Sequence, residues 1–389
     1  MGGPAGRSPR LKMARKLKSD KLLFTATVLL VCTSIVMVYS ASAVVADQQY
    51  NNPYLFLFKQ VTWALLGLLF VQLVMRIDYH TYREPTWIWA ALLVVCLALV
   101  VVLFGRPVKG ATRWLHIGGL GIQPSELAKL CMIVFVAALL DRRMDRIDEP
   151  ASALLPIGGV LAIIVGLILM QPDLGTAVSI VVIVAVMIFA AGISYRYVFG
   201  LLLLALPTVS VLILVSEYRW KRITAFLDPW KDPLGDGFQM IQSMIAVSTG
   251  GILGRGLMAG VQKLFYLPEP HNDFIYAVIS EELGLVGATV IVGCFCVIAW
   301  RGLRTALRAP DRFGAFLALG LTTMVAFQAF FNISVVLGLL PTKGIPLPLV
   351  SYGGSSLLIN LIGIGILLNV SQHASASHVV TVTLQPADA

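Results

Sequence analysis

Charged residues are scarce in this sequence. Only 13% of its 389 residues are Asp, Glu, Lys or Arg, whereas 58% are hydrophobic. Soluble domains carry about 25% charged residues, and half that density does not cover a water-exposed surface. The scarcity therefore excludes a soluble enzyme, a disordered chain and a fibrous repeat. It indicates a multi-pass membrane protein.

Cysteines and clustered metal ligands are also few. The five cysteines all fall within apolar runs, and the five histidines follow no metal-ligand spacing. Thiols in such runs are typical of packing residues rather than of disulfides or metal sites. The glycine run at residues 250–256 lacks the Gly-Lys-Ser/Thr that ends a phosphate-binding P-loop. The sequence shows no metal cage and no motif for an organic cofactor.

Ten apolar segments approach or meet the length of about 20 residues that a membrane-spanning helix needs. They are residues 22–46, 56–75, 86–104, 125–140, 155–170, 175–192, 198–216, 274–300, 314–337 and 353–372. We therefore expect an all-α fold with ten transmembrane helices over residues 22–372. A basic tail precedes it at residues 1–21, and a second tail follows at residues 373–389.

The distribution of Lys and Arg predicts the orientation. With the N-terminus inside, short inner segments hold seventeen of these residues and short outer segments hold four. This asymmetry places both termini in the cytoplasm. Residues 105–124, 217–273 and 338–352 then lie outside, with 217–273 a large extracytoplasmic loop between helices 7 and 8. Residues 40–43 resemble a signal-peptide cleavage site, but nine further spans favour a retained first helix.

The outer loop 217–273 is rich in groups that suit an anionic lipid head group. Arginine forks match phosphate oxygens, and glycines allow backbone N–H groups to approach them. The basic candidates are Arg219, Lys221, Arg222 and Arg255. An interfacial belt of aromatic and basic residues explains the same composition equally well.

Asp273 stands where this loop enters the next apolar run. A carboxylate at the water–lipid boundary is partly desolvated, so its pKa can rise toward a value useful for a general base. If a helix starts at Asp273, Glu281 lies on the same face eight residues later. Helix capping by Asp273 is the alternative interpretation.

Other polar groups occur near predicted helix ends. Glu126 and Lys129 are i,i+3 neighbours that can form a structural ion pair or contact a substrate. Lys59 is either a partner for one of the acids or a snorkelling residue. Arg113 and Trp114 suit sugar or phosphate, although Trp114 also fits an interfacial belt.

The stretch 341–356 contains three prolines before its Tyr-Gly-Gly-Ser-Ser sequence. Prolines at this density forbid a regular helix. Irregular backbone at membrane depth is tolerated where it lines a cavity or is buried in protein. The stretch therefore favours a cavity over a simple connector.

Six strings in register carry a resemblance to a known family. They are GATRW at 110–114, QPSELAK at 123–129, QPDLGTA at 171–177, PEPHNDF at 268–274, EELG at 281–284 and the stretch 341–356. With these strings the chain resembles the SEDS family (shape, elongation, division, sporulation) of bacterial cell-wall polymerases. The sequence PTKG at 341–344 is more similar to the division members than to the elongation members.

The resemblance implies glycosyl transfer on lipid II. The 4-hydroxyl of one lipid-linked unit attacks the anomeric carbon of another, a β-1,4 glycan forms with inversion, and undecaprenyl diphosphate leaves. Such a step needs one carboxylate base and stabilisation of the departing charge. Asp273 matches the family's essential aspartate and is our catalytic candidate. The substrate-binding candidates are Arg113, Trp114, Glu126, Lys129, Arg219, Arg222 and Glu281, of which Arg219 and Arg222 are assigned to the diphosphate by chemistry.

The resemblance also implies partners and a location. We expect a multi-pass protein of the bacterial inner (plasma) membrane at the division septum. Its partners are lipid II, the growing glycan strand, a class B penicillin-binding protein of the FtsI type and divisome proteins of the FtsQ, FtsL and FtsB type, with no nucleic acid. Mg²⁺ or Mn²⁺ bridging the substrate diphosphate is a hypothesis. An elongation-type polymerase and a lipid II flippase are the alternatives.

Overall fold

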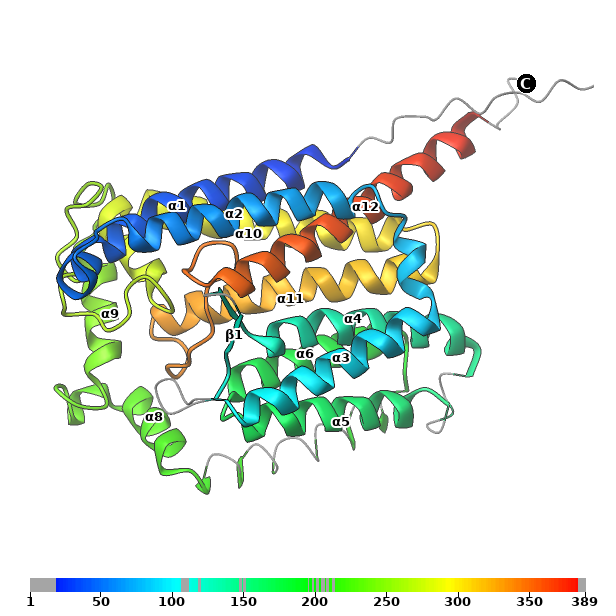
Figure 1. Cartoon of the computed structure of the whole chain (residues 1–389), viewed down its shortest axis with the longest axis horizontal. Coiled ribbons are helices and arrows are strands. Elements are labelled where there is room, and N and C mark those ends of the chain that lie inside the picture. Colours follow the sequence, from blue (N-terminus) through cyan, green and yellow to red (C-terminus); the bar gives the residue numbers. More distant parts are fainter. Residues whose placement is uncertain are drawn as a thin grey trace, which may run out of the picture.

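The computed structural model is a bundle of helices (Figure 1). It describes residues 19–105, 112–117, 120–146, 149, 152–194, 196, 197, 199, 200, 203, 207, 210, 211 and 214–383. The long helices are α1 (Lys21–Tyr50), α2 (Leu55–Val74), α3 (Pro85–Leu103), α4 (Pro124–Arg143), α5 (Leu154–Met170), α6 (Leu174–Ala190), α10 (Ile275–Arg308), α11 (Arg312–Val336) and α12 (Gly354–Thr383). The shorter ones are α8 (Glu217–Leu227), α9 (Phe238–Thr249) and the 3₁₀ turns η1 (Tyr79–Arg83), η2 (Met144–Arg146) and η3 (Pro229–Lys231).

Nine of the ten predicted spans coincide with these helices. Among the described residues, six helices are long and apolar enough to cross a membrane, namely α1, α2, α3, α10, α11 and α12 over Gly354–Ala374. Helices α5 and α6 are apolar but have only 17 residues each. Helix α4 has 20 residues, among them Glu126 and Lys129. About half of the remaining predicted span, 198–216, lies outside the described residues.

A short β-hairpin departs from the all-α expectation. Strands β1 (Leu115–Ile117) and β2 (Leu120–Ile122) pair antiparallel, with Leu115 opposite Ile122. The alternation of apolar residues in both segments suits this pairing. The fold is therefore mainly helical, with one hairpin leading into α4.

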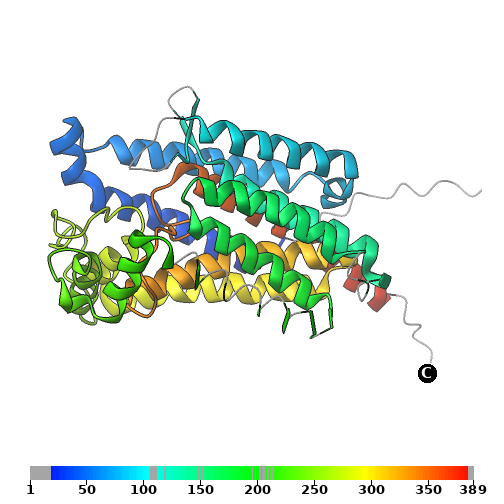
Figure 2. The same cartoon turned by 90° about the horizontal axis from the view of Figure 1, so that it is seen from below.

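The long helices run side by side, and the two ends of the bundle differ (Figures 1 and 2). Helices α8 and α9 and the hairpin gather at one end, whereas the last turns of α12 project from the other. Helices α11 and α12 are the most enclosed spans, with 67% and 83% of their apolar windows buried. Helix α12 continues to Thr383, so the predicted tail at 373–389 begins as helix.

The predicted outer loop 217–273 is partly helical, and its glycine run packs against a break in α10. The break is at Gly284, where φ is 65° and ψ is −165°. The N–H groups of Arg255 and Gly256 donate to the freed carbonyls of Glu281 and Glu282, both at 3.0 Å. A Cβ on Gly284 would lie 2.3 Å from the nitrogen of Gly254, so no larger residue fits. These two N–H groups are hydrogen-bonded within the fold. They are therefore not available as the phosphate ligands that the sequence suggested.

Candidate functional site

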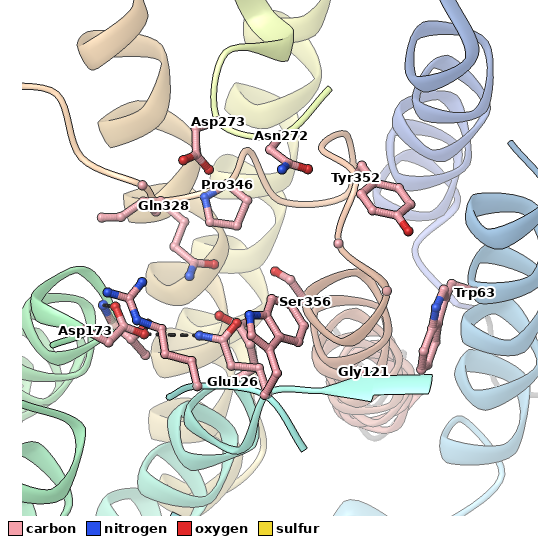
Figure 3. Close-up of a pocket in the computed structure, with 18 of the residues that line it drawn as sticks. Trp63, Gly121, Glu126, Asp173, Asn272, Asp273, Gln328, Pro346, Tyr352 and Ser356 are labelled. Carbon is pink, nitrogen blue, oxygen red and sulfur yellow. Dashed lines mark hydrogen bonds between the residues drawn. The ribbon is translucent and has the colours of Figure 1, made fainter. Parts of the chain in front are cut away.

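A cavity of about 350 Å³ is lined in part by Gly121 of strand β2. Its lining includes four of the predicted site residues: Arg113, Trp114, Glu126 and Asp273. Asp273 lies at one end of the cavity, Glu126 lies at the other, and Gln328 points into the space between them (Figure 3). The stretch 341–356 contributes Gly344, Pro346 and Tyr352 to the wall. The prediction that this irregular stretch lines a cavity is confirmed.

The main-chain carbonyl of Asp273 is fixed by a hydrogen bond, and its side chain does not cap helix α10. Helix α10 begins at Ile275 and its N-cap is Phe274, so the geometry disfavours the capping interpretation. The side-chain amide of Asn332 in α11 donates to the carbonyls of both Asp273 and Ile345, each at 2.7 Å. This one side chain therefore fixes the catalytic candidate relative to the proline-rich stretch.

Further hydrogen bonds join the same two segments. The hydroxyl of Ser351 donates to the carbonyl of Asn272 at 2.7 Å, and the N–H of Tyr352 donates to the carbonyl of His271 at 2.9 Å. Gly344 lies directly against the Asp273 carboxylate. Residues 271–273 and 344–352 thus form one hydrogen-bonded wall of the cavity.

Glu126 and Lys129 form an ion pair inside the bundle. Their Oε1 and Nζ atoms lie 2.8 Å apart, and the side chains are 4% and 1% exposed. Lys129 is not among the cavity-lining residues, but Glu126 is. The second oxygen of Glu126 is buried and accepts no hydrogen bond from any described residue. Lys129 therefore holds one carboxylate oxygen while the other is available to a ligand.

Three of the sequence strings meet at the cavity. Arg113 donates from Nε to the carbonyl of Gln171 at 3.2 Å. The amide of Gln123 donates to Asp173 at 3.1 Å, and Asp173 also caps α6. The ring of Trp114 packs over Gly121, which in turn lines the cavity.

A group of basic side chains lies beside this wall. Arg222 of α8 donates from Nη1 to the carbonyl of Thr342 at 2.9 Å. Burial, together with the charges of Arg219, Arg222 and Arg113, lowers the pKa of Lys343 from its ordinary 10.5 to about 7. Arg219 and Arg222 are not among the lining residues, but with Arg113 they concentrate positive charge next to the cavity.

Glu281 lies away from the cavity lining. Its carboxylate is fully buried and accepts the N–H of Val261 at 2.8 Å and that of Gln262 at 3.2 Å. Because α10 starts at Ile275, the expected common face with Asp273 does not form. This geometry favours Glu281 as a support for the loop 250–263 rather than as a substrate ligand.

Sequence reasoning missed Gln328, Asn332 and Lys343 as site residues. The side-chain oxygen of Gln328 is buried at the cavity and accepts no hydrogen bond from the described part of the chain. Gln328 and Asn332 are four residues apart within an apolar run, so they share one face of α11. Isolated amides at helical spacing in a membrane segment were the available signal.

Comparison with known proteins confirms the family that the six sequence strings indicated. Residues 20–376 match the model of the FtsW/RodA/SpoVE family, described as cell cycle proteins. A probable peptidoglycan glycosyltransferase FtsW of Geobacter sp. (strain M18) is 44% identical over 357 residues, covering 90% of this chain and 96% of the relative. Stage V sporulation protein E of Bacillus subtilis (strain 168) is 44% identical over 365 residues, covering 92% and 99%.

Solved structures share the fold. A chain from a peptidoglycan synthase complex, in which polymerisation and crosslinking are coordinated, superimposes with a TM-score of 0.75 at 30% identity and covers 92% of this chain and 99% of that chain. The rod shape determining protein RodA of Thermus thermophilus gives a TM-score of 0.68 at 28% identity, covering 92% and 97%. The chain belongs to the SEDS family of membrane proteins, the family of FtsW, RodA and SpoVE.

Proposed function

We propose that this chain is a peptidoglycan glycosyltransferase that polymerises lipid II into β-1,4 glycan strands and releases undecaprenyl diphosphate. One observation carries the proposal: Asp273, Trp114 and Arg113 line the same cavity, and Arg219 and Arg222 lie beside it. The cavity thus combines a carboxylate, an aromatic face for a sugar, and positive charge for a diphosphate. The names of the relatives, probable peptidoglycan glycosyltransferases, support the same activity.

The chemistry requires two contributions from these residues. The Asp273 carboxylate accepts the proton of the attacking 4-hydroxyl, which makes that oxygen a better nucleophile. Arg219 and Arg222, with Arg113, stabilise the negative charge that develops on the leaving diphosphate. Because a diphosphate leaves without protonation, the reaction needs no second carboxylate. Trp114 and the second oxygen of Glu126 bind the sugars within the cavity, and Lys129 holds Glu126 in place.

A metal ion would depend on the substrate for most of its ligands. No group of three His, Cys, Asp or Glu side chains in the described ranges could hold one. A Mg²⁺ or Mn²⁺ ion would therefore bind through diphosphate oxygens and water, as Mg²⁺ commonly does. It would add charge neutralisation to that of the arginines, and no step above requires it.

The proposed topology has ten spans with both termini in the cytoplasm. The Lys/Arg asymmetry supports this orientation, and the cavity then faces the outer leaflet, where flipped lipid II is found. Residues 217–273 form the large outer loop.

The proposed partners and location follow the division members of the family. The similarity to a chain from a peptidoglycan synthase complex supports a class B penicillin-binding protein as partner. The FtsW relatives and the PTKG sequence at 341–344 support septal synthesis with FtsQ-, FtsL- and FtsB-type proteins over the elongation role.

Polymerisation in detergent tests the function. Purified protein, with its class B penicillin-binding protein partner present, is incubated with labelled lipid II, and the products are separated by gel electrophoresis. We expect a ladder of glycan strands. Because detergent removes membrane sidedness, a flippase would leave lipid II unchanged, and that result would contradict the proposal.

A further inference from the structure

Lys343 occupies an unusual electrostatic position. It follows Thr342, whose carbonyl accepts the Arg222 guanidinium at 2.9 Å, and it precedes Gly344, which lines the cavity. Within the described residues its ammonium group forms no close ion pair or hydrogen bond, and Asp173 is the acidic group whose charge acts on it. A partly buried lysine without a partner is costly to keep charged.

Three of the four charges that act on Lys343 add to this cost, whereas Asp173 offsets part of it. The charged groups that act on it are Arg113 before β1, Arg219 and Arg222 of α8, and Asp173 at the start of α6. Three of the four are guanidinium groups, which remain protonated at any ordinary pH. Lys343 therefore adds a fourth positive charge to a group that already repels it.

Asp173 offsets only part of this positive charge. Its carboxylate accepts the hydroxyl of Thr176 at 2.8 Å and the amide of Gln123 at 3.1 Å, and it caps α6 through the N–H of Thr176 at 3.3 Å. Two carboxylates, Asp173 with these partners and Asp273 against Gly344, stand beside four basic side chains. The arrangement is complementary to a ligand with at least two negative charges.

We propose that Lys343 belongs to the diphosphate-binding site together with Arg113, Arg219 and Arg222, and that it takes up a proton from water when the diphosphate binds. The inference rests on the proposed function for the identity of the ligand, because it deepens the description of that same site. The recognised chemistry is a diphosphate, either free or at the end of a polyprenyl chain. The pKa of about 7 in the empty site supports the proton uptake, since a bound dianion favours the charged lysine.

Calorimetry on the purified full-length protein in detergent tests this site without any turnover. The titrants are farnesyl diphosphate, inorganic pyrophosphate and farnesyl monophosphate, measured at pH 8 in two buffers that differ in ionisation enthalpy. The variants are Lys343→Met and Lys343→Arg. Lys231→Met is the matched control, because Lys231 is an exposed lysine at the end of η3 in the same outer loop.

We expect Lys343→Met to weaken diphosphate binding about tenfold to hundredfold, the value of one charge-assisted hydrogen bond. Lys343→Arg and Lys231→Met should bind nearly as the wild type does. Wild type should take up a larger fraction of a proton per diphosphate than Lys343→Arg. Tighter binding of farnesyl diphosphate than of pyrophosphate would identify the lipid-linked group as the ligand, and equal binding would identify the diphosphate alone.

Equal affinity and equal proton uptake in wild type and Lys343→Met would overturn the inference. So would binding of the monophosphate as tightly as the diphosphate. These outcomes are separate from the proposed function. Glycan synthesis by the wild type, with no effect of Lys343→Met on diphosphate binding, would contradict only the role of Lys343. Diphosphate binding that depends on Lys343, without glycan synthesis, would contradict only the proposed polymerase activity.

Discussion

The Asp273 carboxylate and Gly344 share one tight space in the cavity wall. A Cβ atom placed on Gly344 would stand 2.9 Å from Oδ2 of Asp273, closer than real Cβ atoms approach a neighbour. The glycine therefore allows the proline-rich stretch to pass directly behind the proposed base. The position of the carboxylate depends on a residue 71 positions later in the chain.

Replacing Gly344 with alanine should displace the carboxylate and leave the fold intact. A shift of about 1 Å at a reacting group can cost on the order of a hundredfold in rate, so we expect a loss of that order in glycan synthesis. Gly293→Ala on α10 is the control, because nothing lies within 4 Å of its added methyl group. Equal activity of Gly344→Ala and wild type would contradict the close fit.

Asn332 should act as a positioning residue. Asn332→Leu removes the donor shared by the carbonyls of Asp273 and Ile345 and leaves both without it. Each lost buried partner costs about 1–3 kcal/mol, so the thermal unfolding temperature should fall. The turnover number should fall as well, with little change in the KM for lipid II, because Asn332 does not line the cavity. A change in KM alone would instead indicate a substrate contact.

The Glu126–Lys129 pair allows a structural role to be separated from a functional one. Lys129→Met leaves a buried carboxylate unpaired, which costs about 3–5 kcal/mol. The double variant with Glu126→Gln should recover much of that stability, measured by thermal unfolding. It should not recover lipid II polymerisation, because Glu126 lines the cavity. Recovery of both properties would assign the pair to structure alone.

Lys343 should make the stability of the empty protein depend on pH. Its pKa is about 7 in the folded chain, whereas the ordinary value of 10.5 applies when the chain is unfolded. Between these values the unfolded state binds more protons, so stability rises with pH over this window. The unfolding temperature of wild type should therefore rise from pH 7 toward pH 10 more steeply than that of Lys343→Met. Parallel curves would contradict the low pKa.

Some of these features were predictable from sequence and others were not. Asp273, Arg113, Trp114 and Glu126 occur in recognisable strings, and apolar length located α4, which carries Glu126, and α10, which begins two residues after Asp273. The start of α10 at Ile275 was not predictable, because two residues decide whether Asp273 caps the helix or lies outside it. Glu281 looked like a site residue, but it accepts backbone N–H groups of residues 261 and 262 and lies 3.7 Å from the Arg255 guanidinium, and these contacts follow from tertiary packing.

The site contacts that depend on tertiary packing were also hidden. Asn332 meets Asp273 across 59 residues of sequence, and its role appears only when α11 lies beside the loop. Lys343 was visible only as a basic residue in an outer loop. Its significance comes from Arg113, Arg219 and Arg222, which reach it from two other segments. Long-range electrostatic neighbours of this kind leave no periodic signal in a sequence.

The most direct test of the central claim is the rate of lipid II polymerisation by Asp273→Asn, with lipid II binding measured on the same sample. Loss of a general base costs about 10²–10⁴-fold, so we predict a loss in that range with lipid II affinity retained. Asp228→Asn, at an exposed carboxylate in the same outer loop, should retain full activity. Polymerisation by Asp273→Asn at the wild-type rate would contradict the assignment of Asp273 as the base.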